Sequence, residues 1–522
     1  MSNCPADITP YAQSTDTASK SVSNVNYSNQ DFWSLKIRLT SLIQERFGVN
    51  GTELPDTFND LIESSIAIML IENWAFIGDM LSFKMDQNVN EIFIDTVTEL
   101  DNAFRLAKLV GFQPTPPIAS TSFWTAMLNA PQATDLVIAT PLAIPLPSTT
   151  KFNTTIELFP ADSNNQPIFN QDIIIPAGQT INQTIVGIEG LTITQSSSGT
   201  GSAGQSIALS NYPVLFDSVN VQVDGNTWKQ VDYFTDSQPR MEYRVEYNSL
   251  YQAFVIFGNN SAGMIPSNGS QIVLTFRVGG GAAGNIVTGA IQYQIQAFVP
   301  GLNFSVPISF RNYTAGQFGY SGDGLEDIRR KLPKWTQTQE RMVSPNDFKT
   351  LCEQFITPYD GQIGKATAAL RNYGCSGNIV DLYVLAINTG VLQIASDNLK
   401  SDLNNYINTN KMLTDFVCIR DGVILSTDIL IDLTLDRSNR KFEAELNDSV
   451  TRLINIFFNI NNWDFGDVLK DTDVIKILSS VNQIKGFNIT FVTQQGASGQ
   501  VITPKYYEII QPDNINISFV YE

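Results

Sequence analysis

Residues 255–285 read VIFGNNSAGMIPSNGSQIVLTFRVGGGAAGN, and this stretch decides which fold we expect. Its second half alternates strictly between apolar and more polar side chains, the apolar set being Ile272, Leu274, Phe276 and Val278. Such alternation predicts a half-buried strand. A short apolar run before Gly258 predicts a second strand, and the glycines and Pro266 in between predict a long turn that joins the two.

The glycine run 279–284 suggests a phosphate loop, since backbone N–H groups without neighbouring side chains can bind an anion. A phosphate loop, however, needs Lys followed by Ser or Thr and then a helix. Here Gly284 is followed by Asn285 and then by residues typical of a strand. The run therefore predicts a tight crossing between strands and no nucleotide-binding site.

The spacing of residues in this stretch resembles a known family. The likeness is carried by Phe257, Gly258, Asn259, Gly263, Pro266, Asn268, Gly269, Ile272, Arg277, Gly279, Gly280, Gly281, Gly284 and Asn285. Together they are similar to the β-domain signature of the baseplate J-like family of phage baseplate wedge proteins. Two further passages are similar to the same family, at Phe93–Pro114 and at Gly324–Phe348.

Length and charge limit the possible functions. A chain of 522 residues predicts about two to four domains, and 43% hydrophobic with 16% charged residues is typical of a folded globular protein. With 51 acidic against 32 basic residues, the net charge of −19 would repel a nucleic-acid backbone. We therefore expect no nucleic-acid partner.

The chain contains no histidine, which excludes Ser-His-Asp and Cys-His nucleophiles and every metal site that uses histidine. The cysteines at 4, 352, 375 and 418 form no CxxC motif and are typical of free thiols in a reducing cytoplasm. These cysteines would form a zinc site only if the fold brought them together from distant parts of the chain. We expect no catalytic residues, no cofactor and no metal.

The N-terminal part is expected to be helical. Residues 1–30 are polar and predict a flexible arm without a secretory signal, and residues 31–113 predict a helical segment. Apolar residues recur at steps of three and four from Asp56 to Met85, which predicts a long helix with a wide apolar face. That face packs either within the chain or against another subunit, and its candidate interaction residues are Ile62, Ile66, Met69, Trp74, Ile77 and Leu81.

Two further features of this segment carry expectations. The richest apolar stretch, Ile66–Ile77, contains Glu72 and Asn73 and is expected to be too short to span a bilayer, which predicts no membrane insertion. Thr96 and Glu99 have the spacing of a capping box and predict the start of a second helix, which Gly111 ends.

The rest of the chain predicts strands first and then mixed structure. Residues 118–312 hold short runs separated by Pro, Gly and Asn, typical of a β-rich domain, with a hairpin at Asp224-Gly225. Residues 325–492 predict an α+β region with two strand–helix units, and Ser344 is the expected N-cap of one helix. Residues 505–522 predict a lone C-terminal strand whose open edge invites a neighbour. The expected fold class is α+β multidomain: an N-terminal helical bundle segment, a β-rich middle domain and C-terminal α+β modules.

Two linkers predict hinges. The first, Pro114–Pro117, is stiff and includes Pro116, and the second, Ala315–Gly324, is glycine-rich and includes Gly322 and Gly324. Rigid domains joined at these linkers would rotate as bodies.

The family resemblance implies a structural baseplate wedge subunit of a contractile phage tail, without enzymatic activity. It implies a place in the virion's tail baseplate after assembly in the host cytoplasm. It also implies contacts with other wedge proteins and with copies of itself, as a dimer in each wedge of a ring of six wedges. Two alternatives stay open: a tail-associated polysaccharide depolymerase, which needs only two carboxylates, and a receptor-binding adhesin.

Overall fold

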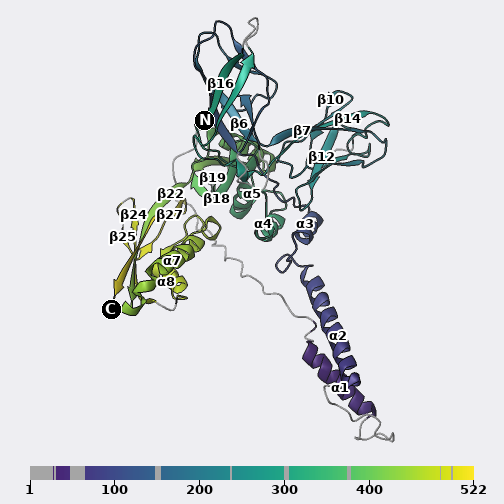
Figure 1. Ribbon diagram of the computed structural model, residues 1–522, viewed down its shortest axis with the longest axis vertical. Helices are drawn as coiled ribbons and strands as arrows, with labels where there is room; N and C mark the ends of the chain where they lie inside the picture. The colour runs from purple at the N-terminus through teal and green to yellow at the C-terminus, as the bar shows by residue number, and fades with distance from the viewer. Residues whose placement is uncertain are drawn as a thin grey trace. The chain divides into compact units, whose positions relative to one another are not determined.

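The computed structural model describes residues 28, 31–47, 65–146, 155–234, 238–298, 305–372, 378–481, 484–494, 496 and 498–521 (Figure 1). The chain divides into two compact units. The helical unit comprises Ser19–Pro114 and Gly324–Leu332. The main unit contains Thr115–Asp323 and Pro333–Glu522. The predicted arm at 1–30 lies outside the described residues, apart from Ser28.

The helical unit is built on two helices that lie side by side (Figure 1). Its elements are α1 (Phe32–Phe47), α2 (Ile66–Asn90), α3 (Leu100–Leu109) and the first turns of α4 (Leu325–Thr338). Helix α1 begins where Ser34 N donates to the Asp31 carboxylate at 2.8 Å, a typical N-cap. The predicted start of the long helix at Asp56 lies outside the described residues, and its described part runs on past Met85 to Asn90.

Helices α1 and α2 contact each other through a small apolar seam and one ion pair. Lys36 Nζ lies 2.7 Å from a carboxylate oxygen of Glu72. Gly78 permits the close approach, since a Cβ there would lie 2.9 Å from a methyl group of Leu35. The residues of α2 that are buried are Ile68, Ile71, Ala75 and Asn90.

The β-rich part of the main unit contains four sheets. One has six strands in the order β15 (Gln292–Phe298), β16 (Ser305–Asn312), β1 (Thr121–Leu128), β6 (Ile181–Glu189), β4 (Thr155–Pro160) and β3 (Leu142–Pro145), and a small sheet pairs β2 (Leu136–Ile138) with β5 (Ile173–Ile175). The third has the order β10 (Asn226–Thr227), β9 (Asn220–Val223), β14 (Gln271–Val278) and β7 (Leu191–Ser198). The fourth has the order β11 (Lys229–Gln230), β12 (Glu242–Tyr247), β13 (Ala253–Phe257) and β8 (Ser206–Ala208).

The two strands predicted from residues 255–285 are confirmed as β13 and β14. They belong to different sheets, so the turn between them crosses from one sheet to the other. Their inward residues share one core, and Ile272, Leu274 and Phe276 are all fully buried. The predicted hairpin at Asp224-Gly225 is also confirmed, because β9 pairs with β10 and Trp228 N donates to Val221 O.

The glycine run binds an anion that belongs to the protein itself. Gly280 N and Gly281 N donate to the carboxylate of Glu189 at 2.8 and 3.1 Å. Position 284 accepts only glycine, since a Cβ there would lie 2.5 Å from the Glu189 Cβ. Burial raises the pKa of Glu189 to about 7, against the opposing effect of these two hydrogen bonds and of the Arg277 charge.

The C-terminal part consists of two α+β modules. The first contains α5 (Pro345–Glu353), α6 (Asp397–Asn410) and a sheet of β17 (Ile356–Thr357), β18 (Gly361–Asn372), β19 (Asn378–Asn388), β20 (Val391–Gln393) and β21 (Asp415–Asp421). The second contains α7 (Glu443–Phe457), α8 (Asp471–Leu478), a sheet ordered β25 (Ser498–Gly499), β24 (Ile484–Thr493), β22 (Val423–Leu435) and β27 (Glu508–Tyr521), and the pair β23 (Leu469–Lys470) and β26 (Val501–Ile502). Short 3-10 helices cover Ala282–Gly284, Arg437–Phe442 and Ile460–Asn462.

The predicted helix start in this part is confirmed, whereas the predicted lone strand is not. Ser344 caps α5 in a full capping box with Asp347, as predicted. The last strand, expected to stand alone, instead pairs in parallel with β22 along Val423–Leu435. Helices, then a β-rich region, then mixed modules make up the chain, so the predicted α+β multidomain class is confirmed.

Candidate interaction surface

Helix α2 presents an apolar surface that the described chain leaves uncovered. Trp74, for example, is 67% exposed. We call this surface the α2 face, and its large exposed apolar residues are Ile66, Met69, Leu70, Trp74, Phe76, Ile77, Met80, Leu81, Phe83 and Met85. The buried seam against α1 uses a different side of the helix, around Ile71 and Ala75. A helix that is apolar nearly all round needs a further partner or an apolar surrounding.

The sequence-predicted interaction residues fall on this face where the structure describes them. Ile66, Met69, Trp74, Ile77 and Leu81 all lie on α2 with exposed side chains. Ile62 lies outside the described residues. Sequence reasoning did not single out Trp33 and Ile37, which are also exposed, on α1. Their four-residue spacing was the available signal, because it places both on one side of a helix.

The length of α2 corrects one expectation. Within the described chain, α2 is a helix of 25 residues whose length and composition are sufficient to cross a membrane. The sequence stretch Ile66–Ile77 was expected to be too short, but the helix continues through apolar residues as far as Met85. Length and composition therefore leave a membrane as a second conceivable surrounding for the α2 face.

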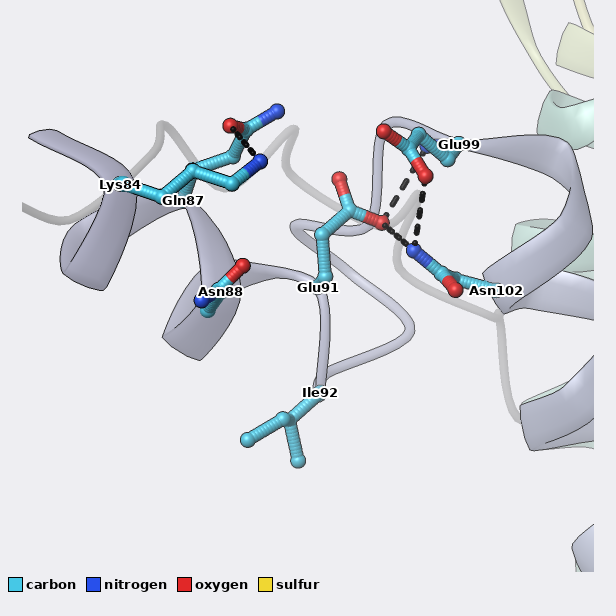
Figure 2. A pocket seen from close by; sticks show the side chains of 7 residues that line it. All are labelled: Lys84, Gln87, Asn88, Glu91, Ile92, Glu99 and Asn102. Atoms are coloured by element: carbon cyan, nitrogen blue, oxygen red, sulfur yellow. Dashed lines mark hydrogen bonds between the residues drawn. The ribbon is translucent and has the colours of Figure 1, made fainter.

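The turn after α2 is held by one carboxylate, that of Glu91, which lies in a hollow of about 330 Å³ (Figure 2). Thr98 N donates to this carboxylate at 2.9 Å, Asn102 Nδ2 donates at 2.9 Å, and the Thr98 hydroxyl donates as well. Figure 2 shows Glu91 directed toward Glu99 and Asn102, whereas Ile92 points away from them. Burial is the largest single effect on the pKa of Glu91 and raises it, but the hydrogen bonds together outweigh burial and hold the pKa below its usual value.

The predicted capping box at Thr96 and Glu99 is wrong. The hydroxyl of Thr96 donates to Asn90 O at 2.6 Å, and Glu99 makes no side-chain cap at the start of α3. Glu91 supplies the cap from the preceding turn, because its carboxylate reaches the free N–H groups of Thr98 and Glu99. The helix ends as predicted, with Gly111 at a φ of 82°. This arrangement fixes the direction in which α3 leaves α2.

The predicted hinge residues lie in different settings. Pro116 is buried in the main unit, where Thr115 N donates to Asp323 Oδ2 at 2.9 Å and Asp323 N donates to Thr115 O. Gly322 is in the same unit with a φ of 91°, against the ring of Tyr251. Gly324 is the first residue after the boundary between the units. The hydrogen bonds between Thr115 and Asp323 hold the two predicted linkers to each other inside the main unit.

Within the described ranges, no group of three or more His, Cys, Asp and Glu side chains is placed to hold a metal ion. Cys352 and Cys418 are buried free thiols, and burial raises the pKa of Cys352 well above its usual value.

Comparison with known proteins gives one sequence match. Residues 43–109 match the family model for the bacteriophage baseplate protein, N-terminal domain. This range includes α2 with its exposed face, and also α3. No curated protein sequence matches the chain.

Two solved structures show a weak likeness. One is a chain of the anti-feeding prophage (AFP) baseplate, with a TM-score of 0.36 and 8% identity over 92% of this chain and 90% of that one. The other is a chain of the type VI secretion system TssK-TssF-TssG baseplate subcomplex, with a TM-score of 0.25 and 9% identity over 68% of this chain and 96% of that one. At these TM-scores neither likeness establishes a shared fold.

Proposed function

We propose that this chain is a structural subunit of the baseplate of a phage-type contractile tail, and that the α2 face binds helices of neighbouring baseplate subunits. The proposal rests on two findings that concern the same segment. The segment that matches a baseplate-protein domain, residues 43–109, is also the segment whose large apolar residues are exposed. Buried apolar surface is worth about 25 cal/mol per Å², so covering a face with several large side chains gives substantial binding free energy.

The finer role that we propose is that of a wedge subunit. The three passages that resemble the baseplate J-like family support it, and they imply paired copies in each of six wedges that surround a central hub. The partners are then other wedge proteins and a second copy of this chain, and the location is the tail baseplate of the virion, assembled in the host cytoplasm. The chain then acts through its contacts and has no enzymatic activity of its own.

During sheath contraction such a subunit changes its contacts. We propose that Pro114, Gly324 and Pro333 serve as the hinges, because the chain passes between its two compact units at Pro114, at Gly324 and, inside α4, before Pro333. Pro114 and Gly324 lie next to the hydrogen-bonded pair Thr115 and Asp323, so a rotation at them would keep these hydrogen bonds. Helix α4 would have to bend at Pro333 in the same movement.

The test is assembly with an altered α2 face. In a strain that lacks this gene, tails are counted by electron microscopy after complementation with the native chain, with Trp74→Glu/Leu81→Glu, or with Arg38→Glu. Arg38 is exposed on α1 and is not one of the residues of the α2 face, so its variant adds the same negative charge to the same unit without changing that face. We expect the double variant to lose assembled tails and the control to keep them, because burying a charge in an apolar contact is unfavourable.

Normal tail numbers with the double variant would contradict the proposal. A flotation assay with phosphatidylglycerol-containing vesicles addresses the membrane alternative. If the native chain floats with the vesicles, the double variant does not, and tails still assemble, the α2 face binds lipid and the subunit contact is refuted. Release of reducing sugar from host polysaccharide by the purified chain would contradict the non-enzymatic role.

A further inference from the structure

A second hollow, of about 310 Å³, lies entirely within the main unit. Segments far apart in the sequence form it: the start of β1, the turn at 164–166, residues 317–318, the turn before β18, Ala386 of β19, and the residues that lead into α6. Its volume is near the lower end of the ~300–1,000 Å³ that is usual for small-molecule sites. None of the described residues that line it belongs to the α2 face.

A buried hydroxyl in this hollow has no hydrogen-bond partner among the described residues. The side chain of Thr121 lines the hollow and is 8% exposed, and its Oγ1 makes no hydrogen bond. Its backbone groups are fully engaged, since its N–H donates to Gln317 O and its carbonyl accepts from Gln317 N. Buried polar atoms in folded proteins are nearly always paired, so this hydroxyl is available to bond to a ligand group in the hollow.

The polar lining is made of one carboxylate and several amides. Gln166 Nε2 donates to Asp360 Oδ2 at 2.9 Å, and Asn398 Nδ2 donates to Asn164 O at 3.3 Å. Gln317 and Gln393 add two further amide groups. An amide offers both donors and acceptors, and a carboxylate accepts from several hydroxyl groups. The lining is thus suited to a ligand whose groups donate and accept at once.

Three aromatic side chains line the wall: Phe123, Phe318 and Tyr359. Phe318 is held in place: its backbone has a φ of 66°, and its N–H donates to Asn388 Oδ1 at 3.1 Å. Gly361 lies directly against its ring, where a Cβ would come within 2.4 Å of a ring carbon. The ring is therefore positioned before any ligand arrives, which lowers the entropy cost of binding.

The charges exclude other ligand classes. None of the described lining residues is Lys or Arg, so a phosphate or carboxylate ligand has no counter-ion there and meets the charge of Asp360. A single carboxylate is also too small a ligand set for a divalent cation. We propose that this hollow binds a neutral saccharide, one pyranose ring at a time, with Asp360 and Thr121 bonding to ring hydroxyl groups and Phe318 packing against the apolar side of the ring.

The proposal goes beyond a purely structural subunit, since it assigns the chain a contact with glycan. It is tested on the full chain by saturation-transfer NMR and calorimetry with glucose, galactose, mannose and N-acetylglucosamine. We expect at least one of the four to bind, with a Kd of about 1 mM. Asp360→Asn and Thr121→Val should each weaken binding about tenfold, because each removes a hydrogen-bonding group from the site.

The matched control is Asp397→Asn, which makes the same charge change at an exposed residue of α6 beside the hollow. It should leave the Kd unchanged, and the thermal unfolding of all three variants shows that each is folded. The proposal is overturned if none of the four sugars binds, or if the three variants bind the sugar as the native chain does. It is likewise overturned if the hollow is protected from hydrogen exchange only in assembled tails, since a neighbouring subunit then occupies it.

Discussion

Arg277 Nη1 donates to Glu157 Oε2 at 2.8 Å, and the two side chains are only 7% and 2% exposed. The pair joins β14 of one sheet to β4 of another, and a second nitrogen of Arg277 donates to the carbonyl groups of Ile188, Glu189 and Gly190. One guanidinium therefore fastens two sheets of the main unit to each other.

Glu157→Gln should lower the free energy of unfolding by about 3–5 kcal/mol, because it leaves the Arg277 charge buried without its partner. Asp436→Asn serves as the control, since Asp436 pairs with Lys485 on the surface and should lose about 1 kcal/mol or less. Urea unfolding followed by hydrogen exchange in β4 and β14 measures both. Adding Arg277→Met to Glu157→Gln should restore part of the loss, and a loss as small as that of the control would show that the pair is not structural.

The free energy of unfolding should depend on pH in part through the titration of Glu189. Its folded-state pKa of about 7 lies above its usual 4.5, so the native form binds this proton more tightly. The resulting stability is complete below pH 4.5 and is lost as the pH rises through about 7, an effect of about 3 kcal/mol. Glu189→Gln should remove this pH dependence, so that the stability of the native chain falls relative to that of the variant between pH 5 and pH 8. Parallel pH profiles of the two proteins would contradict this assignment.

Gly322→Ala should destabilise the main unit more than Gly225→Ala does. The φ angle is 91° at Gly322 and 80° at Gly225. An alanine at either position would have to adopt the left-handed conformation, which costs about 1 kcal/mol. Only at Gly322 would the new Cβ also meet a ring, 2.7 Å from Tyr251, whereas nothing lies within 4 Å at Gly225. The thermal unfolding of the two variants gives the comparison, and equal losses would mean that the ring moves freely aside.

Glu91→Ala should loosen α3 without unfolding it. Removing a helix cap costs about 1 kcal/mol, which corresponds to a roughly fivefold faster opening of the first turn. Hydrogen exchange of the α3 amides is the measurement, and Asp95→Ala, at an exposed position in the same turn, is the control. Unchanged exchange in α3 would assign the cap to another group.

Structural features that depend on only a few neighbouring residues were predicted correctly from the sequence. The alternation in β14, the hairpin at Asp224-Gly225 and the capping box at Ser344 each depend on neighbours within about one turn or strand, and each is confirmed. The apolar residues of α2 likewise indicated a helix with a wide face. Whether another part of the chain covers that face is a question about distant segments, which periodicity does not answer.

Most of the features that were not predicted from the sequence depend on contacts between residues far apart in the chain. Alternation places Arg277 on the outer side of β14, yet it is buried because a strand more than a hundred positions earlier supplies Glu157. The anion of the glycine run is supplied by Glu189, another distant residue. The predicted cap of α3 is wrong for a local reason. Thr96 has the right spacing, but its hydroxyl donates to Asn90 O, and the carboxylate of Glu91 accepts from the N–H group of Thr98 instead. The hollow proposed to bind a saccharide has no signal in the sequence, since its described lining comes from six separate segments.

The parallel pairing of β27 with β22 also has a consequence for how the protein is made. The strand that closes this sheet is translated after every other element of the second module, so β22 emerges from the ribosome long before its neighbour exists. A product that stops short of Glu508 would keep one full side of β22 unpaired and ready to recruit strands from other nascent chains. Complete synthesis is therefore itself a safeguard against aggregation.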